Sequence, residues 1–255
     1  MTRNVRRITL APAYILHHRP YRDTSRILEI ITQEHGRLAL FARGVRGPKA
    51  KLAAILQPFR LLLLSWSGRG EAAQLTAAEC ADHEPPLPAA CIMASFYLNE
   101  LLLKLTTRHD PLPALFDDYH AAVAGLRAGQ PLEPALRVFE KRLLDALGYG
   151  PDLATEAHTG KPIQPDGYYH FRPAQGLFPT IREAGGALAG RSIIGLAGER
   201  LAGARELEDS RRLLQAALAH CLEGRELTTR TVAKAVHGLR PGFNAVRAKP
   251  RTSEN

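Results

Sequence analysis

The sequence of 255 residues has no apolar run near the ~18 residues that a membrane-spanning helix requires. Cysteine is scarce as well, because Cys80, Cys91 and Cys221 are far apart and include no C-x-x-C pair. This spacing argues against a disulfide framework and against a zinc site of four cysteines. A strand-like segment rather than a leucine-rich one follows the basic residues 1–7, so no export signal is predicted. We expect a globular protein of the reducing cytoplasm that does not enter a membrane.

Motifs that supply catalysis are missing too. The glycine-rich segment Gly44–Lys49 has neither the spacing nor the hydroxyl of the phosphate-binding loop G-x-x-x-x-G-K-[ST]. Neither the G-x-S-x-G motif of hydrolases nor the H-E-x-x-H motif of zinc proteases occurs. His17 and His18 are adjacent in a predicted strand, where neighbouring side chains point to opposite faces and cannot hold one ion. We expect no catalytic residue, no metal and no cofactor, and therefore a protein that is not an enzyme.

Positive charge is present in excess and is concentrated in the first third of the chain. The formal net charge is +9, from 34 lysine and arginine residues against 25 aspartate and glutamate residues. Residues 1–80 contain 13 of the basic and 5 of the acidic residues and so carry +8. This distribution is typical of a module that binds a polyanion, joined to a nearly neutral body. A chance excess on a soluble surface is the alternative.

Five short strands are predicted in this basic segment, because apolar residues recur there with a period near two or in short runs. They are Ile8–His17, Ser25–Thr32, Arg37–Arg43, Pro58–Trp66 and Glu71–Ala78. A longer loop or helix over residues 44–57 separates the third strand from the fourth. This arrangement suits a small closed barrel of the oligonucleotide-binding (OB) kind, with an SH3-like barrel or an open sheet as alternatives.

After the proline-rich junction at residues 81–88 the period becomes that of helices. The predicted helices are Ala89–Arg108, which is apolar on most faces, Pro111–Ala128, Pro134–Leu147, a short one after Gly190, Asp209–Leu222 and Thr228–His237. The fold class is therefore α+β. The predicted domains are the OB barrel, residues 1–80, a helical domain, residues 81–240, and a basic, disordered tail, residues 241–255. An irregular insertion in the helical domain, at about residues 150–180, is rich in glycine and proline and contains a small β-ribbon near Tyr168–Phe171.

The basic residues of the barrel are placed where they can follow a phosphate backbone. They flank the turn into the second strand, bracket the third strand and occupy the loop after it, which on a small barrel are positions of one rim and one face. The candidates for DNA binding are Arg19, Arg22, Arg26, Arg37, Arg43, Arg46, Lys49 and Lys51. For the aromatic residues of this segment a core or rim position is favoured over base stacking, so backbone contacts are favoured over sequence readout. These residues are Tyr14, Tyr21, Phe41, Phe59 and Trp66.

Six motifs follow one another between residues 19 and 150. They are RPYRDTS at residues 19–25, ARGVRG at 42–47, LQPF at 56–59, YLNEL at 97–101, ALRVFE at 135–140 and LGYG at 147–150. In this order they resemble the RPxxETS, KGAR, LQPF, YxNEL, ALRxFE and LGYG motifs of the bacterial RecO family of DNA repair and recombination mediators. Beyond residue 180 the resemblance is faint.

The resemblance implies an N-terminal OB barrel, a helical domain, and a protein that binds single- and double-stranded DNA and anneals complementary strands. It implies as partners the acidic C-terminal tail of single-stranded-DNA-binding protein, RecR, often RecF, and the recombinase RecA that is loaded onto gapped DNA. A nucleoid-associated location in the cytoplasm follows. Many members bind zinc through four cysteines in the region corresponding to Pro151–Phe171. This sequence has only His158 and His170 there, so it resembles a zinc-lacking type.

With the resemblance, the predicted helix Pro134–Leu147 becomes the expected binding site for that acidic tail. Phe139, Leu143 and Leu147 form one apolar stripe, and Arg137 lies near its polar border. An acidic peptide that ends in a hydrophobic residue needs such a groove and a fixed guanidinium for its carboxylate. The alternative is that the stripe is ordinary core of a helix bundle and Arg137 a solvated charge.

Two other functions are open. An OB barrel with a basic rim also suits an RNA-binding protein of RNA maturation, because only contacts to the 2′-hydroxyl separate the two polymers. A nuclease would need carboxylates clustered around metal ions, whereas the acidic residues of the first 80 residues are scattered. Other carboxylates lie on predicted helix surfaces, where we expect them to be solvated; they include Glu140, Asp145, Glu206 and Glu208.

Overall fold

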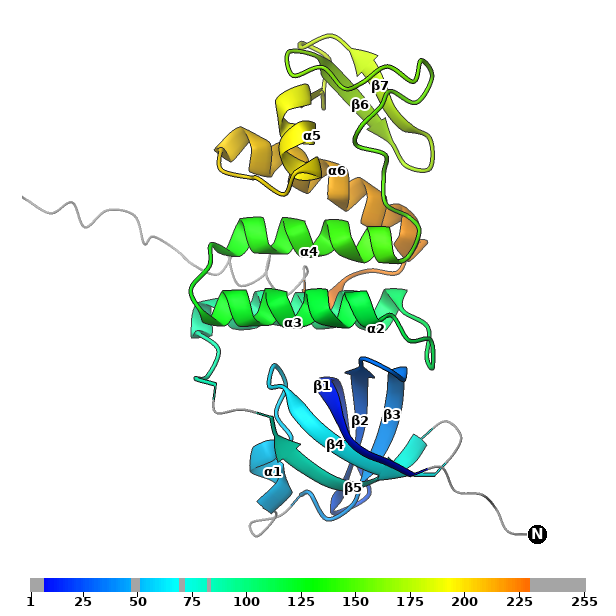
Figure 1. Ribbon diagram of the computed structural model, residues 1–255, viewed down its shortest axis with the longest axis vertical. Coiled ribbons are helices and arrows are strands. Elements are labelled where there is room, and N and C mark those ends of the chain that lie inside the picture. Colours follow the sequence, from blue (N-terminus) through cyan, green and yellow to red (C-terminus); the bar gives the residue numbers. More distant parts are fainter. Residues whose placement is uncertain (1–6, 47–50, 69–71, 82–83, 230–255) are drawn as a thin grey trace, which may run out of the picture.

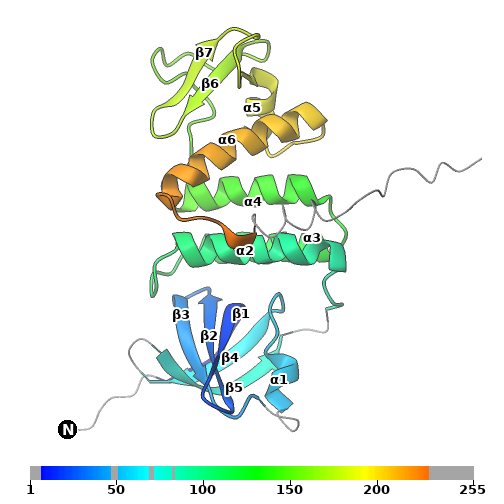
Figure 2. The same cartoon turned by 180° about the vertical axis from the view of Figure 1, so that it is seen from behind.

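The computed structural model describes residues 7–46, 51–68, 72–81 and 84–229. Figure 1 shows three parts stacked along the long axis: a β-barrel, a layer of helices, and a small sheet with two further helices. The view from behind shows the same order (Figure 2). The fold is α+β as predicted, with a barrel followed by a mainly helical region that contains a small sheet.

The barrel is closed by five strands in the order β1-β2-β3-β5-β4. The parallel pairing of β3 with β5 closes it, and the other neighbouring strands are antiparallel. Apolar side chains from all five strands fill its interior. This OB-like barrel confirms the predicted fold and excludes an open sheet. Its elements are β1 (Arg7–Tyr21), β2 (Ser25–Thr32), β3 (Gly36–Ala42), α1 (Lys51–Ile55), β4 (Leu62–Ser67) and β5 (Ala72–Cys80).

Strand β1 is longer than predicted, because it continues from His17 to Tyr21. Its first half pairs with β4 and its second half with β2, and each half contains a bulge. Bulges bend a strand and strengthen its twist, so one strand can border two neighbours around the barrel. The extension places Tyr21 opposite Ser25 of β2, where the two strands join in a tight turn.

His17 and His18 follow the second bulge of β1 and pair in register with two consecutive residues of β2. The two imidazole rings are stacked, with centroids 6.5 Å apart and an interplanar angle of 27°. Within the described residues, however, no group of three or more histidine, cysteine, aspartate or glutamate side chains could hold a metal ion.

The helical domain begins with a 3-10 turn, Ala89–Cys91, and its helices agree with the prediction to within a few residues. Three of them, α2, α3 and α4, form the middle layer of Figure 1. The predicted ribbon is the hairpin of β6 and β7, and β8 extends it to a sheet of order β7-β6-β8. The elements are α2 (Ile92–Leu105), α3 (Pro113–Arg127), α4 (Leu132–Ala146), β6 (Tyr168–Arg172), β7 (Gly176–Thr180), β8 (Leu188–Ala189), α5 (Gly190–Ala197) and α6 (Ala204–Leu222).

Helix α6 begins at Ala204, before the predicted start at Asp209, because an acidic residue caps its true start. Glu206 accepts hydrogen bonds from the backbone N–H groups of Ala202 and Gly203, which satisfies donors at the helix start. Glu206 is therefore a capping residue rather than a merely solvated charge.

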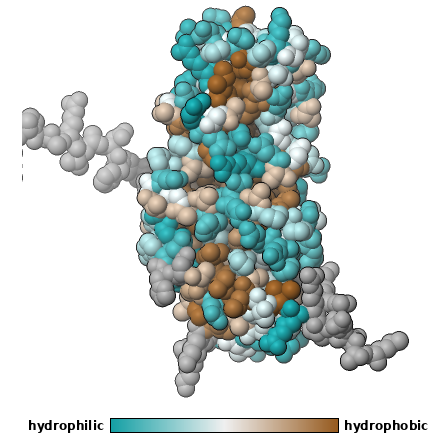
Figure 3. Space-filling model, in the orientation of Figure 1, coloured by the Kyte–Doolittle hydropathy of each residue, from teal (hydrophilic) through white to brown (hydrophobic). Residues whose placement is uncertain are grey.

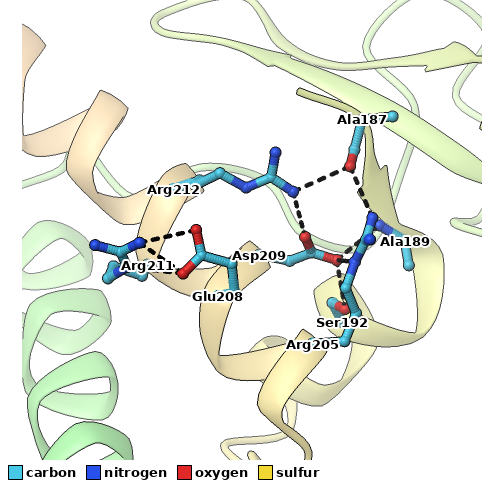
Figure 4. A network of polar contacts seen from close by, with 8 residues as sticks. All are labelled: Ala187, Ala189, Ser192, Arg205, Glu208, Asp209, Arg211 and Arg212. Atoms are coloured by element: carbon cyan, nitrogen blue, oxygen red, sulfur yellow. Dashed lines mark hydrogen bonds and ion pairs between the residues drawn. The ribbon is translucent and has the colours of Figure 1, made fainter. Parts of the chain in front are cut away.

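Asp209 joins the small sheet to α5 and α6 (Figure 4). It is 1% exposed, and its carboxylate accepts hydrogen bonds from Ala189 N, Ser192 Oγ, Arg205 Nε and Arg212 Nη2. Burial raises the pKa of Asp209, but these hydrogen bonds outweigh burial and hold the pKa below its usual value. Because Arg205 and Arg212 also donate to the Ala187 carbonyl, the sheet is fixed on the helices.

The barrel and the helical domain share one hydrophobic core. Tyr14 and Leu16 of β1 belong to the same buried cluster as residues of α2 to α6. At this boundary the buried Asn99 of α2 donates from Nδ2 to the Leu16 carbonyl at 2.9 Å, and its Oδ1 accepts from the Tyr119 hydroxyl at 2.6 Å. The Tyr14 hydroxyl lies 2.7 Å from His120 Nδ1. The two parts are therefore docked by packing and by buried hydrogen bonds.

Helix α2 is buried or half-buried along most of its length, as its apolar composition suggested, and only its first turns are open to solvent. Ile92, Met93 and Phe96 in its first turns are 37%, 39% and 39% exposed. The helix begins at the edge of the barrel, where Phe59 contacts Phe96 with ring centroids 4.9 Å apart but does not cover it. In the space-filling view, apolar residues gather at the level of the barrel and again near the small sheet (Figure 3).

After α6 the chain returns to α2 (Figure 2). The Glu100 carboxylate accepts hydrogen bonds from Thr228 N and from Thr229 N and Oγ1, at 2.8, 2.9 and 2.6 Å. Burial raises the pKa of Glu100, but these bonds and Lys104 lower it to about 2. The predicted last helix beyond Thr229 and the predicted tail, residues 241–255, lie outside the described residues.

Candidate nucleic-acid interface

The turn between β1 and β2 is held by the loop that follows β3. Arg22 in this turn has a φ of +51°, in the left-handed region that side chains other than Asn and Asp rarely adopt. Arg46 supports this conformation from both sides, because its Nη1 donates to the Arg22 carbonyl and its backbone N donates to the Thr24 carbonyl, each at 3.0 Å. Two segments distant in sequence, residues 19–25 and residues 42–46, thus form one rim.

An aromatic pair with two flanking guanidinium groups lies at this rim, outside the barrel core. The rings of Tyr21 and Phe41 are 5.1 Å apart and nearly perpendicular, at 85°. Tyr21 is 37% exposed, and Phe41 lies on β3 between two residues that point into the core. The guanidinium carbon of Arg22 is 5.4 Å from the Tyr21 centroid, and that of Arg43 is 5.6 Å from the Phe41 centroid.

These four side chains line a hollow of about 950 Å³ between the β1–β2 turn, β3 and the end of β4. Gln74 of β5 lies in the same hollow and donates from Nε2 to the Phe41 carbonyl at 2.9 Å, which fixes its place. Asp23 contributes a carboxylate. The hollow thus combines exposed cations, amide groups and aromatic rings, the side chains that contact nucleotides.

Arg19 lies two residues before Tyr21 on β1 and so shares its strand face, whereas Arg26 lies opposite the inward-facing Ala42 and points to the other face. Arg19 is exposed and Arg26 is half-buried. Burial lowers the pKa of the neighbouring His18, and the positive charges of Arg26 and His17 lower it further. The structure therefore brings four of the eight predicted DNA-binding residues to this rim: Arg19, Arg22, Arg43 and Arg46.

Arg37 lies apart from this group, in the junction between the barrel and the helical domain. Its side chain is 13% exposed and forms an ion pair with Glu29 at 3.3 Å. It also donates from Nε to Thr106 Oγ1 at 3.2 Å and from Nη2 to the Thr106 carbonyl at 2.8 Å. These contacts occupy the guanidinium, so we assign Arg37 to the junction rather than to a phosphate. Lys49 and the side chain of Lys51 lie outside the described residues.

Sequence reasoning missed the aromatic pair. A core position holds for three of the five aromatic residues of the barrel segment, Tyr14, Phe59 and Trp66, which are 0%, 6% and 5% exposed. Tyr21 and Phe41 lie at the rim, the other position that the sequence favoured, but their pairing was not predicted. The alternation in β3 carries a signal, because Phe41 is out of phase with the inward-facing Leu40. No local pattern in the sequence shows that Tyr21 lies beside it.

The residues predicted to bind an acidic tail are placed mainly inside the helical layer. Phe139 and Leu143 are 1% and 0% exposed in the shared core, and Leu147 is half-buried at its edge. The apolar stripe is therefore part of the core of the helix bundle, the alternative named above. Phe139 and Leu143 offer no exposed apolar groove. Arg137 is not a solvated charge either, because its side chain is 9% exposed.

Glu140 explains the position of Arg137. It was expected to be solvated, yet it is 0% exposed. Its Oε1 accepts hydrogen bonds from Arg137 Nη2 at 2.7 Å and from the Tyr97 hydroxyl at 2.6 Å. A buried carboxylate needs such partners, since an unpaired charge in the core is costly.

In the part of the chain that the structure describes, no helix is long and apolar enough to cross a membrane.

Comparison with known proteins identifies relatives along almost the whole chain. The family model described as "Recombination protein O N terminal" matches residues 7–83, and that described as "Recombination protein O C terminal" matches residues 91–230. A protein of Methylococcus capsulatus named DNA repair protein RecO is 42% identical over 229 residues, which cover 90% of this chain and 94% of that protein. The protein of the same name from Nitrosococcus oceani is 40% identical over 235 residues, 91% and 96% of the two chains.

Proposed function

Because the chain belongs to the RecO family of DNA repair proteins, we propose that it is a mediator of DNA repair and homologous recombination that binds single- and double-stranded DNA and anneals complementary strands. One observation carries this proposal: the guanidinium groups of Arg22 and Arg43 gather with two aromatic rings around one hollow at the barrel rim. Such a surface attracts a phosphate backbone and leaves room for bases.

Annealing brings two polyanions together, so the protein must neutralise phosphates on both strands. The barrel carries the net positive charge of the chain for this purpose. In the helical domain, by contrast, several arginines are paired with carboxylates, as in the pairs Arg142–Asp118 and Arg212–Asp209. Charge that is already paired attracts a phosphate weakly, which supports DNA binding at the barrel and protein contacts at the helical domain.

The proposed partners are those that the family resemblance implies: the acidic tail of single-stranded-DNA-binding protein, RecR, RecF and RecA. Tail binding near Arg137 remains part of the proposal, but Phe139 and Leu143 would act there only by supporting the helix, because both are buried. We also propose that the protein acts without catalysing a reaction, and that it works in the cytoplasm at the nucleoid.

The test is annealing of complementary DNA strands, naked or coated with single-stranded-DNA-binding protein. Reversal of two exposed charges, Arg22→Glu with Arg43→Glu, should abolish annealing of naked strands, because the rim then repels phosphate. The salt dependence of single-strand affinity should flatten by about 0.7 log unit per decade for each phosphate that the variant no longer neutralises. Arg46 is left intact, since it holds the turn.

Arg200→Glu is the control for charge reversal elsewhere, because the exposed Arg200 follows α5, a helix that lies far from the barrel in Figure 1. It should anneal strands like the unaltered protein. Unchanged annealing by the double variant would refute DNA binding at the rim. Tighter binding to RNA than to DNA of the same sequence would favour an RNA-binding protein instead. Strands coated with single-stranded-DNA-binding protein that lacks its acidic tail should anneal more slowly than strands coated with the intact protein.

A further inference from the structure

The aromatic pair at the barrel rim has no role in packing the barrel. Tyr21 and Phe41 belong to neither of the two buried hydrophobic clusters. Tyr21 keeps 37% of its surface exposed at the end of β1. The two rings leave apolar surface in contact with water, which is unfavourable. A ligand that covers the rings would therefore gain binding free energy by burying this surface.

The geometry of the pair fits a flat, unpaired ring. Because the two rings are nearly perpendicular, a third planar ring can stack on one of them while its edge meets the other. The hollow of about 950 Å³ that they line is open to solvent and large enough for a nucleotide. Nucleobases stack on aromatic side chains in this manner, largely independently of sequence.

Cations lie where the phosphates of such a nucleotide would be. Arg22 and Arg43 flank the two rings at 5.4 and 5.6 Å from the ring centroids. Arg46 holds Arg22 in place through the left-handed turn conformation, so the first of these cations is positioned by the fold. A nucleotide can therefore stack its base on one ring while its phosphate binds the neighbouring guanidinium.

We propose that Tyr21 and Phe41 form a stacking site for unpaired nucleobases, which gives the barrel a preference for single strands over duplex. In a duplex, each base pair is stacked on its neighbours, so its faces are covered. Only an unpaired base can therefore stack on the rings, whereas phosphates are accessible in both single strands and duplex. This inference rests on the proposed DNA binding and adds to it the part of the strand that the site recognises.

The test compares three probes of equal length at one salt concentration: a thymine single strand, the same strand without bases, and a duplex. Tyr21→Ala should weaken binding of the thymine strand about tenfold. It should leave binding of the abasic strand and the duplex unchanged. Tyr21→Trp should retain single-strand binding, and its fluorescence should be quenched by the thymine strand but not by the duplex. Tyr21→Leu keeps apolar bulk without a ring and should behave like Tyr21→Ala.

Tyr149→Ala is the control, because Tyr149 is 61% exposed at the end of α4, in the helical domain. Equal losses on all three probes, or unchanged affinity for the thymine strand with Tyr21→Ala and Tyr21→Leu, would overturn the stacking site. If the unaltered protein bound none of the probes, the proposed function itself would fail. If it bound them all and the Tyr21 variants were neutral, only the stacking site would fail.

Discussion

At the scale of residues, side chains of the same type have different roles when their surroundings in the fold differ. Arg37 and Arg43 are both arginines at the ends of one predicted strand. Arg43 is exposed beside Phe41, whereas Arg37 is enclosed by Glu29 and Thr106. A guanidinium contributes to a polyanion site only while its charge is accessible, so the two residues have different roles.

Arg37→Ala should therefore reduce stability and spare DNA binding. Hydrogen bonds of charged groups contribute about 1.5–3 kcal/mol, and the variant removes those of Arg37 with Thr106 and Glu29. We expect the free energy of unfolding in urea to fall by about 2 kcal/mol. Arg43→Ala should show the converse, with weaker DNA binding and unchanged unfolding. If Arg37→Ala weakened DNA binding without loss of stability, the assignment to the junction would be wrong.

At the scale of elements, side chains remote in sequence define where segments end and what they contact. The left-handed turn after β1 depends on Arg46 from the loop after β3. The start of α6 depends on Glu206, and the return of the chain to α2 depends on Glu100. In each case one side chain satisfies backbone groups that would otherwise lack partners.

The return segment makes stability depend on pH. The pKa of Glu100 is lowered to about 2 from an ordinary value of 4.5. A carboxylate whose pKa is lowered by folding stabilises the protein fully above its unfolded pKa, and this contribution is lost as pH falls from 4.5 toward 2. Glu100→Gln should be less stable than the unaltered protein at neutral pH. It should also lose less stability across this acidic range, measured by denaturant unfolding at each pH.

Asp166→Asn is a suitable control, because the Asp166 side chain is 86% exposed and its ion pair with Arg191 lies at the surface, where such pairs contribute little to stability. It should follow the pH profile of the unaltered protein. An unchanged acid slope in Glu100→Gln would show that this carboxylate does not anchor the segment.

At the scale of the whole molecule, the shared core makes the barrel and the helical domain one cooperative unit. Tyr14 and Leu16 of the barrel are buried among helical residues, and Asn99 connects the two parts by hydrogen bonds on both sides. A rigid connection keeps the barrel and the helical body in a fixed orientation, which fits the proposed binding of DNA by the barrel and of proteins by the body. This suits transfer of a strand from one protein to another.

Cooperativity can be measured with the single tryptophan. Trp66 is buried in the barrel, whereas most of the helical signal comes from the other domain. Thermal unfolding followed by Trp66 fluorescence and by far-UV circular dichroism should therefore give the same midpoint. Asn99→Ala leaves the Leu16 carbonyl and the Tyr119 hydroxyl without this partner, at about 1–3 kcal/mol for each group, and should lower both midpoints together. Two separate midpoints in the unaltered protein would contradict a single unit.

Much of this fold is predictable from the sequence, and about half of the candidate site. Strands and helices follow from periodicity, which is local, so β2 and β3 match their predicted ranges closely. The rim arginines follow from charge and turn positions. The burial of Glu140, the junction role of Arg37 and the pairing of Tyr21 with Phe41 depend on residues far away in the chain.

The sequence by itself determined the order of a basic β-barrel and a nearly neutral helical body, because hydrophobic period and charge distribution are properties of neighbouring residues. It also carried the motifs of the family. Only the tertiary structure decided which cations stay exposed and which rings meet. Closure of the barrel and docking on the helices enclose Arg37, bury Phe139 and Leu143, and bring Tyr21 and Phe41 together at one rim.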